Sequence, residues 1–357
     1  MKILQICPNY SGAGGVSRYV KNISERLASK HDISVYTLDS LASYPRHEIL
    51  NGVKIFRFQR IVIDNSYFFS WELPLHLRSE YYDVVHAHDY HAFPFFSSIL
   101  SNRKRLFFSL HFHGGSHSFF RNILLKVIGP IGTYALNKGN KIIAVSNYEK
   151  QLITEQLGVN PSQIIVIPCG IKLKDFLGIE KKREELKTIL FVGRLERYKN
   201  PHYLIEVLPY LPNYKLIIVG TGPLKEEIIS RAEELDVSDR VNLYQNVPRE
   251  NLINLYSYAD IFALLSEYEA YSMVVAEALT AGTPCIVLNA SALKEWIDEE
   301  FCFGIDSPIQ ISQIVDKIKM MERSHLINKN SIQNKYLNKK ILDWEEVVSR
   351  IESTYEI

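Results

Sequence analysis

Short apolar runs alternate with amphipathic stretches along the whole of this sequence. Residues 2–6 form the first apolar run and residues 33–38 the next. Between them, Val16, Tyr19 and Ile23 recur at the spacing of one helix face, together with Val20 and Leu27. This pattern predicts a strand, a helix and a second strand, which is one βαβ unit. Further strands are expected at residues 53–58, 83–88, 106–110, 141–145 and 164–167.

The pattern restarts after a charged stretch at residues 172–187, which is rich in Lys and Glu and is expected to be a linker. Asn200-Pro201 and Pro248 mark two helix starts beyond it. The strands of this second series are expected at residues 188–192, 215–219, 241–244, 261–265 and 285–288. The sequence therefore predicts an α/β protein with two Rossmann-like, doubly wound domains. Ligands of such sheets bind beyond the carboxyl ends of the strands, so the chemistry is expected there.

Composition fits two ordinary globular domains, because 357 residues exceed the size of one and show no low-complexity tract. The four cysteines lie far apart and form no C-x-x-C pair, which favours a reducing compartment and predicts a cytoplasmic protein. The opening apolar run is shorter than a signal peptide requires. The apolar tract at residues 119–136 is interrupted by Arg121, Lys126 and a Gly-Pro pair. The protein is therefore expected to be soluble or peripheral.

Charge is distributed unevenly, although the net charge is only +1. Residues 1–175 hold 20 Lys/Arg against 12 Asp/Glu, which gives +8, and residues 176–357 hold 21 against 28, which gives −7. A basic half suggests an anionic partner such as a phosphate-bearing lipid or the inner face of a membrane, and nucleic acid would be attracted by the same physics. The stretch from His117 to Lys126 could rest on an anionic bilayer or be an ordinary core-facing helix.

A glycine-rich loop follows the first strand, from Ser11 to Arg18, and includes Gly12, Gly14 and Gly15. Glycines let a backbone approach a ligand closely, and N–H groups at a helix start favour an anion. The spacing also resembles a dinucleotide fingerprint, with Asp39 where a ribose-binding acid would follow the second strand. An NAD-dependent enzyme is therefore one alternative, and a loop without a ligand is another.

Histidines concentrate in the first half. His86 and His88 alternate on one predicted strand, so both should project to the same face, and the same is expected of His111 and His113. With Asp89 and His91 they could hold zinc in a hydrolase. Alternatively, neutral imidazoles at strand ends could bind sugar hydroxyls, or the histidines could simply be packed or surface residues.

Two charged motifs follow strands of the second half. Arg194 and Lys199 can converge on one diphosphate, as a guanidinium fork and an ammonium point charge. Glu269 is expected in a loop before a helix, and Glu277 two turns into that helix, so that they offer acceptors at two depths of one cleft. Solvated charges are the plainer interpretation of each motif.

Together these motifs resemble the donor site of the retaining family 4 glycosyltransferases. The resemblance rests on Gly193-Arg194-Leu195 through Lys199-Asn200, and on Glu269 and Glu277 with seven residues between them. Other matching pieces lie in the expected order, at Gly14-Gly15 with Arg18 and at residues 83–88, 109–111, 144–146, 167–170 and 281–284. Trp344, near the end of the chain, resembles the family's closing helix.

The resemblance implies the GT-B fold, in which two domains face each other across a cleft. It implies an acceptor-side domain at residues 1–170, a donor-binding domain at 171–341, and a closing helix at 342–357 that crosses back to the first domain. The expected reaction moves a hexose from a UDP- or GDP-linked donor to a glycan or polyprenyl-linked acceptor. The anomeric configuration would be retained, and neither metal nor cofactor is expected.

The same resemblance assigns roles to individual residues. It implies that Arg194 and Lys199 bind the donor diphosphate and that Glu277 binds the ribose. Glu269 and His111 would be the catalytic contacts to the transferred sugar, with His113 as a competitor for the position of His111. The remaining expected substrate contacts are Gly14, Gly15, His88 and Asp89.

This sequence also departs from the family. Ala270-Tyr271-Ser272 stands where Gly-Phe-Gly is usual, and Cys169 where Asn is usual. A zinc hydrolase, an NAD enzyme and a non-catalytic sugar-nucleotide binding protein are the other interpretations. Nucleic acid is not expected as a partner.

Overall fold

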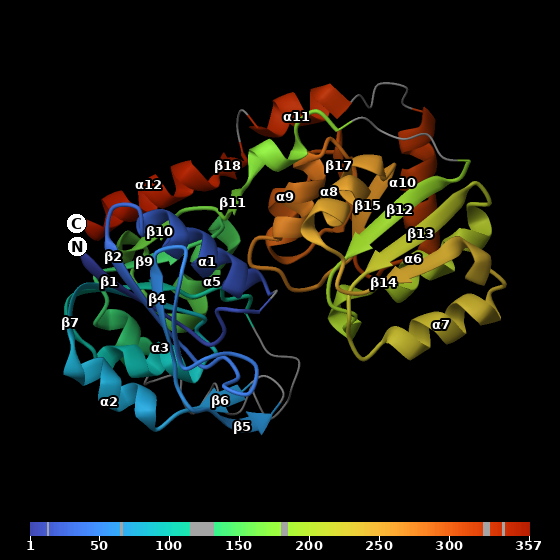
Figure 1. The fold of residues 1–357 in the computed structure, drawn as a ribbon. Helices are drawn as coiled ribbons and strands as arrows, with labels where there is room; N and C mark the ends of the chain where they lie inside the picture. Colours follow the sequence, from blue (N-terminus) through green and yellow to red (C-terminus); the bar gives the residue numbers. More distant parts are fainter. Residues whose placement is uncertain (13, 65–66, 115–131, 180–184, 324–328, 338–339) are drawn as a thin grey trace. The chain divides into compact units, whose positions relative to one another are not determined.

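The computed structural model describes residues 1–12, 14–64, 67–114, 132–179, 185–323, 329–337 and 340–357. The chain divides into two compact units (Figure 1). The first unit is Met1–Gly170 with Leu342–Ile357, and the second unit is Ile171–Ile341. The chain therefore leaves the first unit once and returns to it with its last residues.

The first unit is built on an eight-stranded sheet in the order β10-β9-β8-β7-β1-β2-β4-β3. Neighbouring strands are parallel except β3, which pairs antiparallel with β4. The strands are β1 (Lys2–Cys7), β2 (Asp32–Thr37), β3 (His47–Leu50), β4 (Val53–Arg57), β7 (Tyr81–His88), β8 (Asn102–Ser109), β9 (Lys141–Ala144) and β10 (Ile164–Val166). A separate hairpin joins β5 (Ile61–Asp64) to β6 (Tyr67–Phe69).

Helices connect these strands because apolar side chains recur on one face of each helix. In α1 (Gly15–Leu27) the buried positions include Tyr19, Val20, Ile23 and Leu27. The other described helices of this unit are α2 (Glu72–Ser79), α3 (Phe93–Ser97), α5 (Asn147–Leu157) and α12 (Trp344–Tyr355). Each belongs to the covering of a largely buried parallel sheet.

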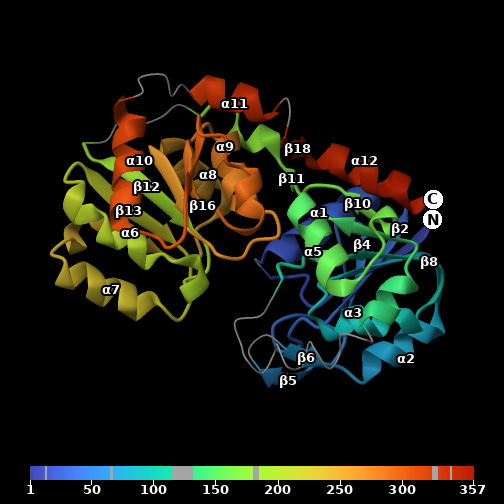
Figure 2. The same cartoon turned by 180° about the vertical axis from the view of Figure 1, so that it is seen from behind.

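The C-terminal helix α12 packs beside α1, as Figure 1 and the reverse view in Figure 2 both show. Asp343 caps the helix by accepting a hydrogen bond from the backbone N–H of Glu345 at 3.0 Å. Gly170 permits close packing here, since a Cβ on it would lie 2.6 Å from the Trp344 ring. The last helix is therefore an integral part of the first unit.

The second unit is built on a six-stranded, all-parallel sheet in the order β14-β13-β12-β15-β16-β17. Its strands are β12 (Lys187–Val192), β13 (Tyr214–Val219), β14 (Val241–Tyr244), β15 (Ile261–Leu264), β16 (Cys285–Leu288) and β17 (Cys302–Ile305). Its helices are α6 (His202–Glu206), α7 (Lys225–Glu234), α8 (Arg249–Tyr258), α9 (Met273–Thr280), α10 (Ile311–Arg323) and α11 (Lys329–Leu337). Both units are therefore doubly wound α/β layers, as the sequence predicts.

All twelve strands expected from the sequence are present, with ends that shift by up to four residues. The hairpin, the edge strands β3 and β17, and the two-residue strands β11 (Gly170–Ile171) and β18 (Leu342–Asp343) were not expected. The expected linker at residues 172–187 is only partly correct, because Leu173–Phe176 forms a 3-10 turn that buries Phe176.

None of the helices in the described ranges has the length and apolar character needed to cross a bilayer.

Candidate active site

In the first unit, Asp39 fixes the loop that joins β1 to α1. Its carboxylate accepts hydrogen bonds from the backbone N–H of Tyr10 at 3.0 Å and from the backbone N–H of Ser11 at 3.1 Å. It also accepts one from the Ser11 hydroxyl at 2.8 Å, and the Arg57 guanidinium lies 3.4 Å away. Asp39 is only 3% exposed. This acid is thus used to shape the loop, and the ribose contact that an NAD enzyme would require of it is not supported.

The glycine pair lies where α1 begins. Gly14 is the N-cap residue, with extended backbone, and Gly15 is the first helical residue. Neither a side-chain cap nor an acidic residue in the first turn occupies this end of the helix. A Cβ on Gly14 would meet nothing within 4 Å, so the approach is open. A helix start of this kind can accept an anionic group on its N–H donors.

A hydrogen-bonded network surrounds the first histidine pair. His86 Nδ1 lies 2.7 Å from the Tyr355 hydroxyl, and its Nε2 lies 2.9 Å from Ser109 Oγ. His88 Nε2 lies 2.7 Å from Gln5 Oε1. The two imidazole centroids are 4.1 Å apart, which confirms that both rings project to one face of β7. Hydrogen bonds of these two histidines thereby connect β7 to β1, β8 and α12.

The imidazoles of this cluster are held neutral. Burial lowers the pKa of His86 to about 3 and that of His111 to about 4, and it also lowers the pKa of His88. Nδ1 of His88 and Nε2 of His111 are buried, with no hydrogen-bond partner among the described residues. Two polar atoms are therefore available for a water molecule or a ligand hydroxyl.

His111 and His113 do not alternate along a strand as expected. β8 ends at Ser109, and His111 has a φ of +51°, in the left-handed region. The His111 ring faces His88 at a centroid distance of 6.0 Å, whereas the His113 ring lies 5.6 Å from that of His91. The turn after the strand thus separates the histidines into two pairs.

Asp89, the last of the site residues predicted in the first unit, also has a left-handed backbone, with a φ of +67°. Its carboxylate accepts from the backbone N–H of His91 at 3.3 Å, and burial raises its pKa to about 6. Across the described residues, no three His, Cys, Asp or Glu side chains are grouped so that they could hold a metal ion. His117 and the stretch to Lys126 lie outside the described residues.

In the second unit, the Gly193-Arg194-Leu195 segment follows β12 and fits closely against the turn after β13. The backbone N–H of Gly193 donates to the Val219 carbonyl at 3.0 Å. The backbone N–H of Leu195 donates to the Thr221 carbonyl at 2.8 Å. A Cβ on Gly220 would lie 1.8 Å from the carbonyl oxygen of Gly193. Gly220 is therefore required for this approach, and the Gly-Thr-Gly sequence at residues 220–222 is the local signal of this turn.

Lys199 and Glu269 form an ion pair, although they lie 70 positions apart in the sequence. Their side chains are only 13% and 14% exposed. Arg194, by contrast, is 67% exposed and donates to the Tyr198 hydroxyl at 2.7 Å. The structure thus joins two of the predicted residues directly and places the third in the same loop with its guanidinium largely open to solvent.

Hydrogen bonds to backbone groups hold the two loops of this ion pair together. The Asn200 amide donates to the Leu265 carbonyl at 3.0 Å, and the Glu267 N–H donates to the Tyr198 carbonyl at 2.8 Å. The Glu269 N–H donates to Ser291 Oγ at 3.1 Å. The segments after β12, β15 and β16 therefore meet at the carboxyl edge of the sheet.

Glu277 is completely buried and pairs with Arg249 at 2.7 Å. It lies four residues after Met273, the first residue of α9, and so about one turn into the helix rather than two. Arg249 begins α8, and its guanidinium also lies 5.5 Å from the centre of the Phe176 ring. Arg249 could not be predicted from the sequence, because no motif links the start of α8 to α9.

Ser272 occupies the N-cap position of α9 with a φ of +73° and no capping hydrogen bond from its side chain, at a position where the family usually has glycine. The preceding Tyr271 is buried, and its carbonyl accepts a hydrogen bond from the Trp296 indole at 2.7 Å. Ser272 therefore has a left-handed backbone without being glycine, and Tyr271 keeps an aromatic ring at the position of the usual Phe.

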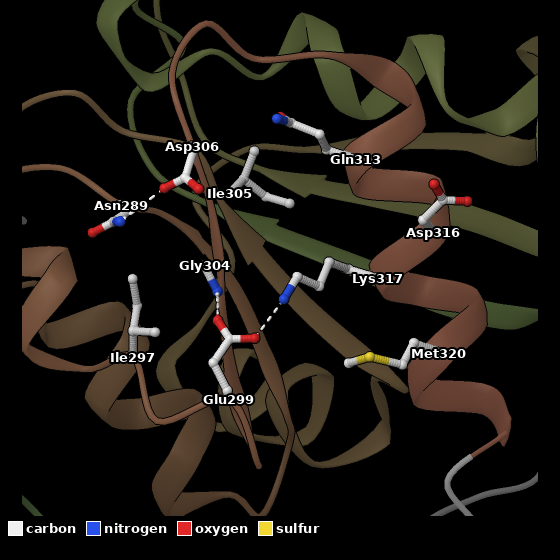
Figure 3. Close-up of a pocket in the computed structure, with 10 residues that line it drawn as sticks. All are labelled: Asn289, Ile297, Glu299, Gly304, Ile305, Asp306, Gln313, Asp316, Lys317 and Met320. Atoms are coloured by element: carbon white, nitrogen blue, oxygen red, sulfur yellow. Dashed lines mark hydrogen bonds and ion pairs between the residues drawn. The ribbon is translucent and has the colours of Figure 1, made fainter.

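A separate pocket of about 380 Å³ lies between the end of β17 and α10 (Figure 3). Glu299 accepts there from the Gly304 N–H at 2.9 Å and pairs with Lys317, while the Asn289 amide donates to Asp306 at 2.8 Å. None of the predicted site residues lines it.

Comparison with known proteins identifies both halves of the chain. The model of Glycosyltransferase Family 4 matches residues 13–175, and the model of Glycosyl transferases group 1 matches residues 174–338. An uncharacterised glycosyltransferase from Methanocaldococcus jannaschii is 27% identical over 100% of this chain and 98% of its own length. An Escherichia coli UDP-Gal:alpha-D-GlcNAc-diphosphoundecaprenol alpha-1,3-galactosyltransferase is 24% identical over 79% of this chain and 76% of its own.

Solved structures share the fold across the whole chain. Sucrose-phosphate synthase from Thermosynechococcus elongatus has a TM-score of 0.83 at 19% identity and covers 99% of this chain and 98% of its own. HepE from Anabaena in complex with UDP has a TM-score of 0.79 at 16% identity, with 100% of both chains covered.

The fold and the matched domains define a glycosyltransferase of the GT-B class. The chain belongs to the glycosyltransferases that combine a family 4 domain with a group 1 domain.

Proposed function

We propose that this glycosyltransferase moves a hexose from a UDP- or GDP-linked donor to a glycan or polyprenyl-linked acceptor, with retention of the anomeric configuration. The second unit is the donor-binding domain, and the first unit supplies the acceptor side. The observation that carries this proposal is the convergence of three strand-end loops on the Lys199–Glu269 pair, with the exposed Arg194 guanidinium in the same loop as Lys199.

Each charge has a role in donor binding. Arg194 binds the diphosphate with a fork of N–H donors, and the Lys199 ammonium moves onto phosphate oxygens. Glu269 is thereby freed to accept hydrogen bonds from the hydroxyls of the sugar. Glu277, held by Arg249, accepts from the ribose hydroxyls.

The first unit contributes neutral hydrogen-bonding groups and helix-terminal N–H groups. The unpartnered nitrogens of His88 and His111 bind hydroxyls at the reacting sugar, with Asp89 nearby, and a neutral imidazole can do so without attracting the departing phosphate. The backbone N–H groups at Gly14 and Gly15 stabilise the charge that develops on that phosphate.

The proposed chemistry needs no side-chain nucleophile. The acceptor oxygen attacks the anomeric carbon from the face that the phosphate leaves, so the new carbon–oxygen bond forms as the old one breaks. A donor phosphate oxygen takes the proton of the acceptor hydroxyl, and the products are the glycoside and a nucleoside diphosphate. Retention follows from this front-face geometry.

We place the enzyme in the cytoplasm, at the inner face of the membrane. The four cysteines are free and buried, which fits a reducing compartment, and the excess positive charge of residues 1–175 fits an anionic lipid surface. Flotation with anionic vesicles at low and high salt tests the lipid contact, and absence of binding at both removes it.

A thermal-shift panel with UDP, GDP, ADP, NAD and EDTA tests the function. A ligand that binds only the folded protein raises its Tm, so UDP or GDP should stabilise it while NAD and EDTA should not. Turnover of the stabilising nucleotide's sugar conjugate, unchanged by EDTA, is the expected companion result. Loss of turnover with EDTA and its recovery with zinc would favour the hydrolase instead.

A further inference from the structure

Glu149 is a buried carboxylate for which the proposed reaction has no use. It lies in the first turn of α5 and is completely inaccessible to solvent. An ionised carboxyl is stable in such a place only when hydrogen-bond donors surround it. Its surroundings therefore indicate what it holds in place.

The carboxylate accepts from the backbone of two separate strand ends. Oε1 accepts from the N–H of Phe112 at 2.6 Å, and Oε2 accepts from the N–H of Val145 at 2.6 Å. Both bonds have the short length expected when a charged acceptor takes part. Phe112 follows β8 and Val145 follows β9, so one side chain connects the carboxyl ends of two neighbouring strands.

This arrangement goes beyond ordinary helix capping. Ser146 caps α5 by accepting from the Glu149 N–H at 3.0 Å, and a Glu at this helix position would commonly bond only to the backbone of the cap itself. Here one oxygen bonds to a residue 37 positions away. The Glu149 side chain therefore fixes the turn after β8 through this hydrogen bond.

The turn that it fixes carries His111. The bonded N–H of Phe112 belongs to the peptide that directly follows His111, whose left-handed backbone has a φ of +51°. A non-glycine residue keeps such a conformation only when its surroundings hold it. That backbone directs the His111 ring to the edge of Tyr19, at a centroid distance of 4.7 Å, and toward His88.

We infer that Glu149 is a positioning residue that fixes the His111 imidazole at the reacting sugar by anchoring the peptide after it to the end of β9. The inference rests on the proposed function for the role of His111 in turnover, whereas the anchoring itself does not. Because the donor nucleotide binds in the second unit, loss of the anchor should lower kcat and leave nucleotide affinity unchanged.

Glu149→Gln in the full chain tests the anchor, with Glu155→Gln as the matched control. Glu155 lies on the exposed side of the same helix. The Gln amide keeps the shape of the carboxyl but directs an NH2 group at one of the two N–H donors. We expect the amide signals of Phe112 and Val145 to shift in NMR spectra and to exchange faster with solvent. Turnover should fall about ten- to a hundredfold, with the Kd for nucleoside diphosphate unchanged.

A measurement on the unaltered protein covers the case in which Glu149→Gln does not fold. Burial raises the pKa of Glu149 to about 7, so the Phe112 and Val145 amide shifts should titrate together near neutral pH. The Cys169 thiol and the Tyr19 phenol interact electrostatically with Glu149, and burial keeps both of them protonated by raising their pKa.

The outcomes separate the anchor from the proposed function. Unchanged amide signals in Glu149→Gln and no shared titration would overturn the inference, as would shifted signals with unchanged kcat when His111→Ala does lower turnover. His111→Ala with full turnover would instead refute the role of His111 in the proposed function, while the amide signals would still report the anchor.

Discussion

The two units present their strand ends in opposite electrostatic forms. At the end of β7 in the first unit, His86 and His88 are neutral and buried, and hydrogen bonds connect both to Tyr355, His86 directly and His88 through Gln5. At the ends of β12 and β15 in the second unit, Lys199 and Glu269 instead form a largely buried ion pair. The first unit thus carries a network of neutral polar side chains at the end of β7. The second unit carries the Lys199–Glu269 ion pair, which we call the charged clamp.

The difference shows how this chain can divide its work. A diphosphate needs cationic groups that can leave their partners, and an ion pair at the edge of a sheet meets that need. The hydroxyls of a sugar need donors and acceptors that do not compete for the phosphate, and neutral imidazoles meet that need. Changes in pH and single substitutions should therefore affect the two units differently.

The largest expected effect is acid destabilisation of the first unit. His86, His88 and His111 take up protons when unfolded below about pH 6.5, but their lowered pKa values keep them neutral in the fold. Each therefore removes about 1.4 kcal/mol from the free energy of unfolding per pH unit as the pH falls. Glu149 and Asp89 have raised pKa values of about 7 and 6, so above pH 4.5 they take up protons more readily in the fold than in the unfolded chain. Their protonation therefore increases the free energy of unfolding as the pH falls. The net loss from pH 6.5 to 4.5 is on the order of 3 kcal/mol.

The second unit should lose less stability over the same range. His202 is half-buried and has a lowered pKa. Asp298 has a pKa lowered to about 2, so it stops stabilising the fold only when the pH falls below 3.8, its pKa in the unfolded chain. Hydrogen exchange at pH 6.5 and pH 4.5, read separately for each unit, measures both effects. Equal loss of protection in the two units would contradict the comparison.

The next effect concerns the charged clamp. Lys199→Ala removes a cation from the proposed diphosphate site and leaves the largely buried Glu269 without its partner. Affinity for nucleoside diphosphate should fall by about 2 kcal/mol, or roughly thirtyfold. Arg197→Ala is the matched control, because Arg197 lies in the same turn but is 84% exposed and pairs with Glu227. Calorimetry that finds the same loss in both variants would argue against a specific clamp.

The smallest expected effect concerns the stability of the turn before α9. Ser272 has a left-handed backbone, and its buried hydroxyl has no hydrogen-bond partner among the described residues. Ser272→Gly removes the strain of a Cβ and adds disorder to the unfolded chain, so a gain of up to about 1 kcal/mol in unfolding free energy is expected. Ser291→Gly should not stabilise the protein, although its φ is +48°, because Ser291 Oγ accepts from the Glu269 N–H. Urea denaturation that finds Ser272→Gly less stable than the parent would refute this explanation.

The architecture was predictable because its central strands are buried on both faces and therefore appear in the sequence as continuous apolar runs. The run at residues 188–192 illustrates this, since all five of its side chains are buried. The edge strand β3 could not be found in this way, because His47, Ile49 and Leu50 are exposed and no apolar run marks it. The Gly-containing edge strand β17 was missed as well.

The site was only partly predictable. Motif spacing indicated Lys199 and Glu269, but that their side chains pair depends on how three loops meet. Arg249 could not be assigned to Glu277, because that contact depends on the packing of α8 against α9. The left-handed turn at His111 is fixed by Glu149, and a hydrogen bond that spans 37 positions leaves no local signal.

The most direct test of the central claim, that the donor lies across the two glutamates of the second unit, is calorimetry on Glu269→Ala and Glu277→Ala. The ligands are the nucleoside, the nucleoside diphosphate and the nucleotide sugar. Glu277→Ala should weaken all three by roughly 1.5–3 kcal/mol, since the ribose is common to them. Glu269→Ala should leave nucleoside diphosphate affinity nearly unchanged while turnover falls, because its contact is to the sugar alone. If Glu269→Ala instead abolishes nucleoside diphosphate binding with the fold intact, the donor does not lie across these residues as proposed.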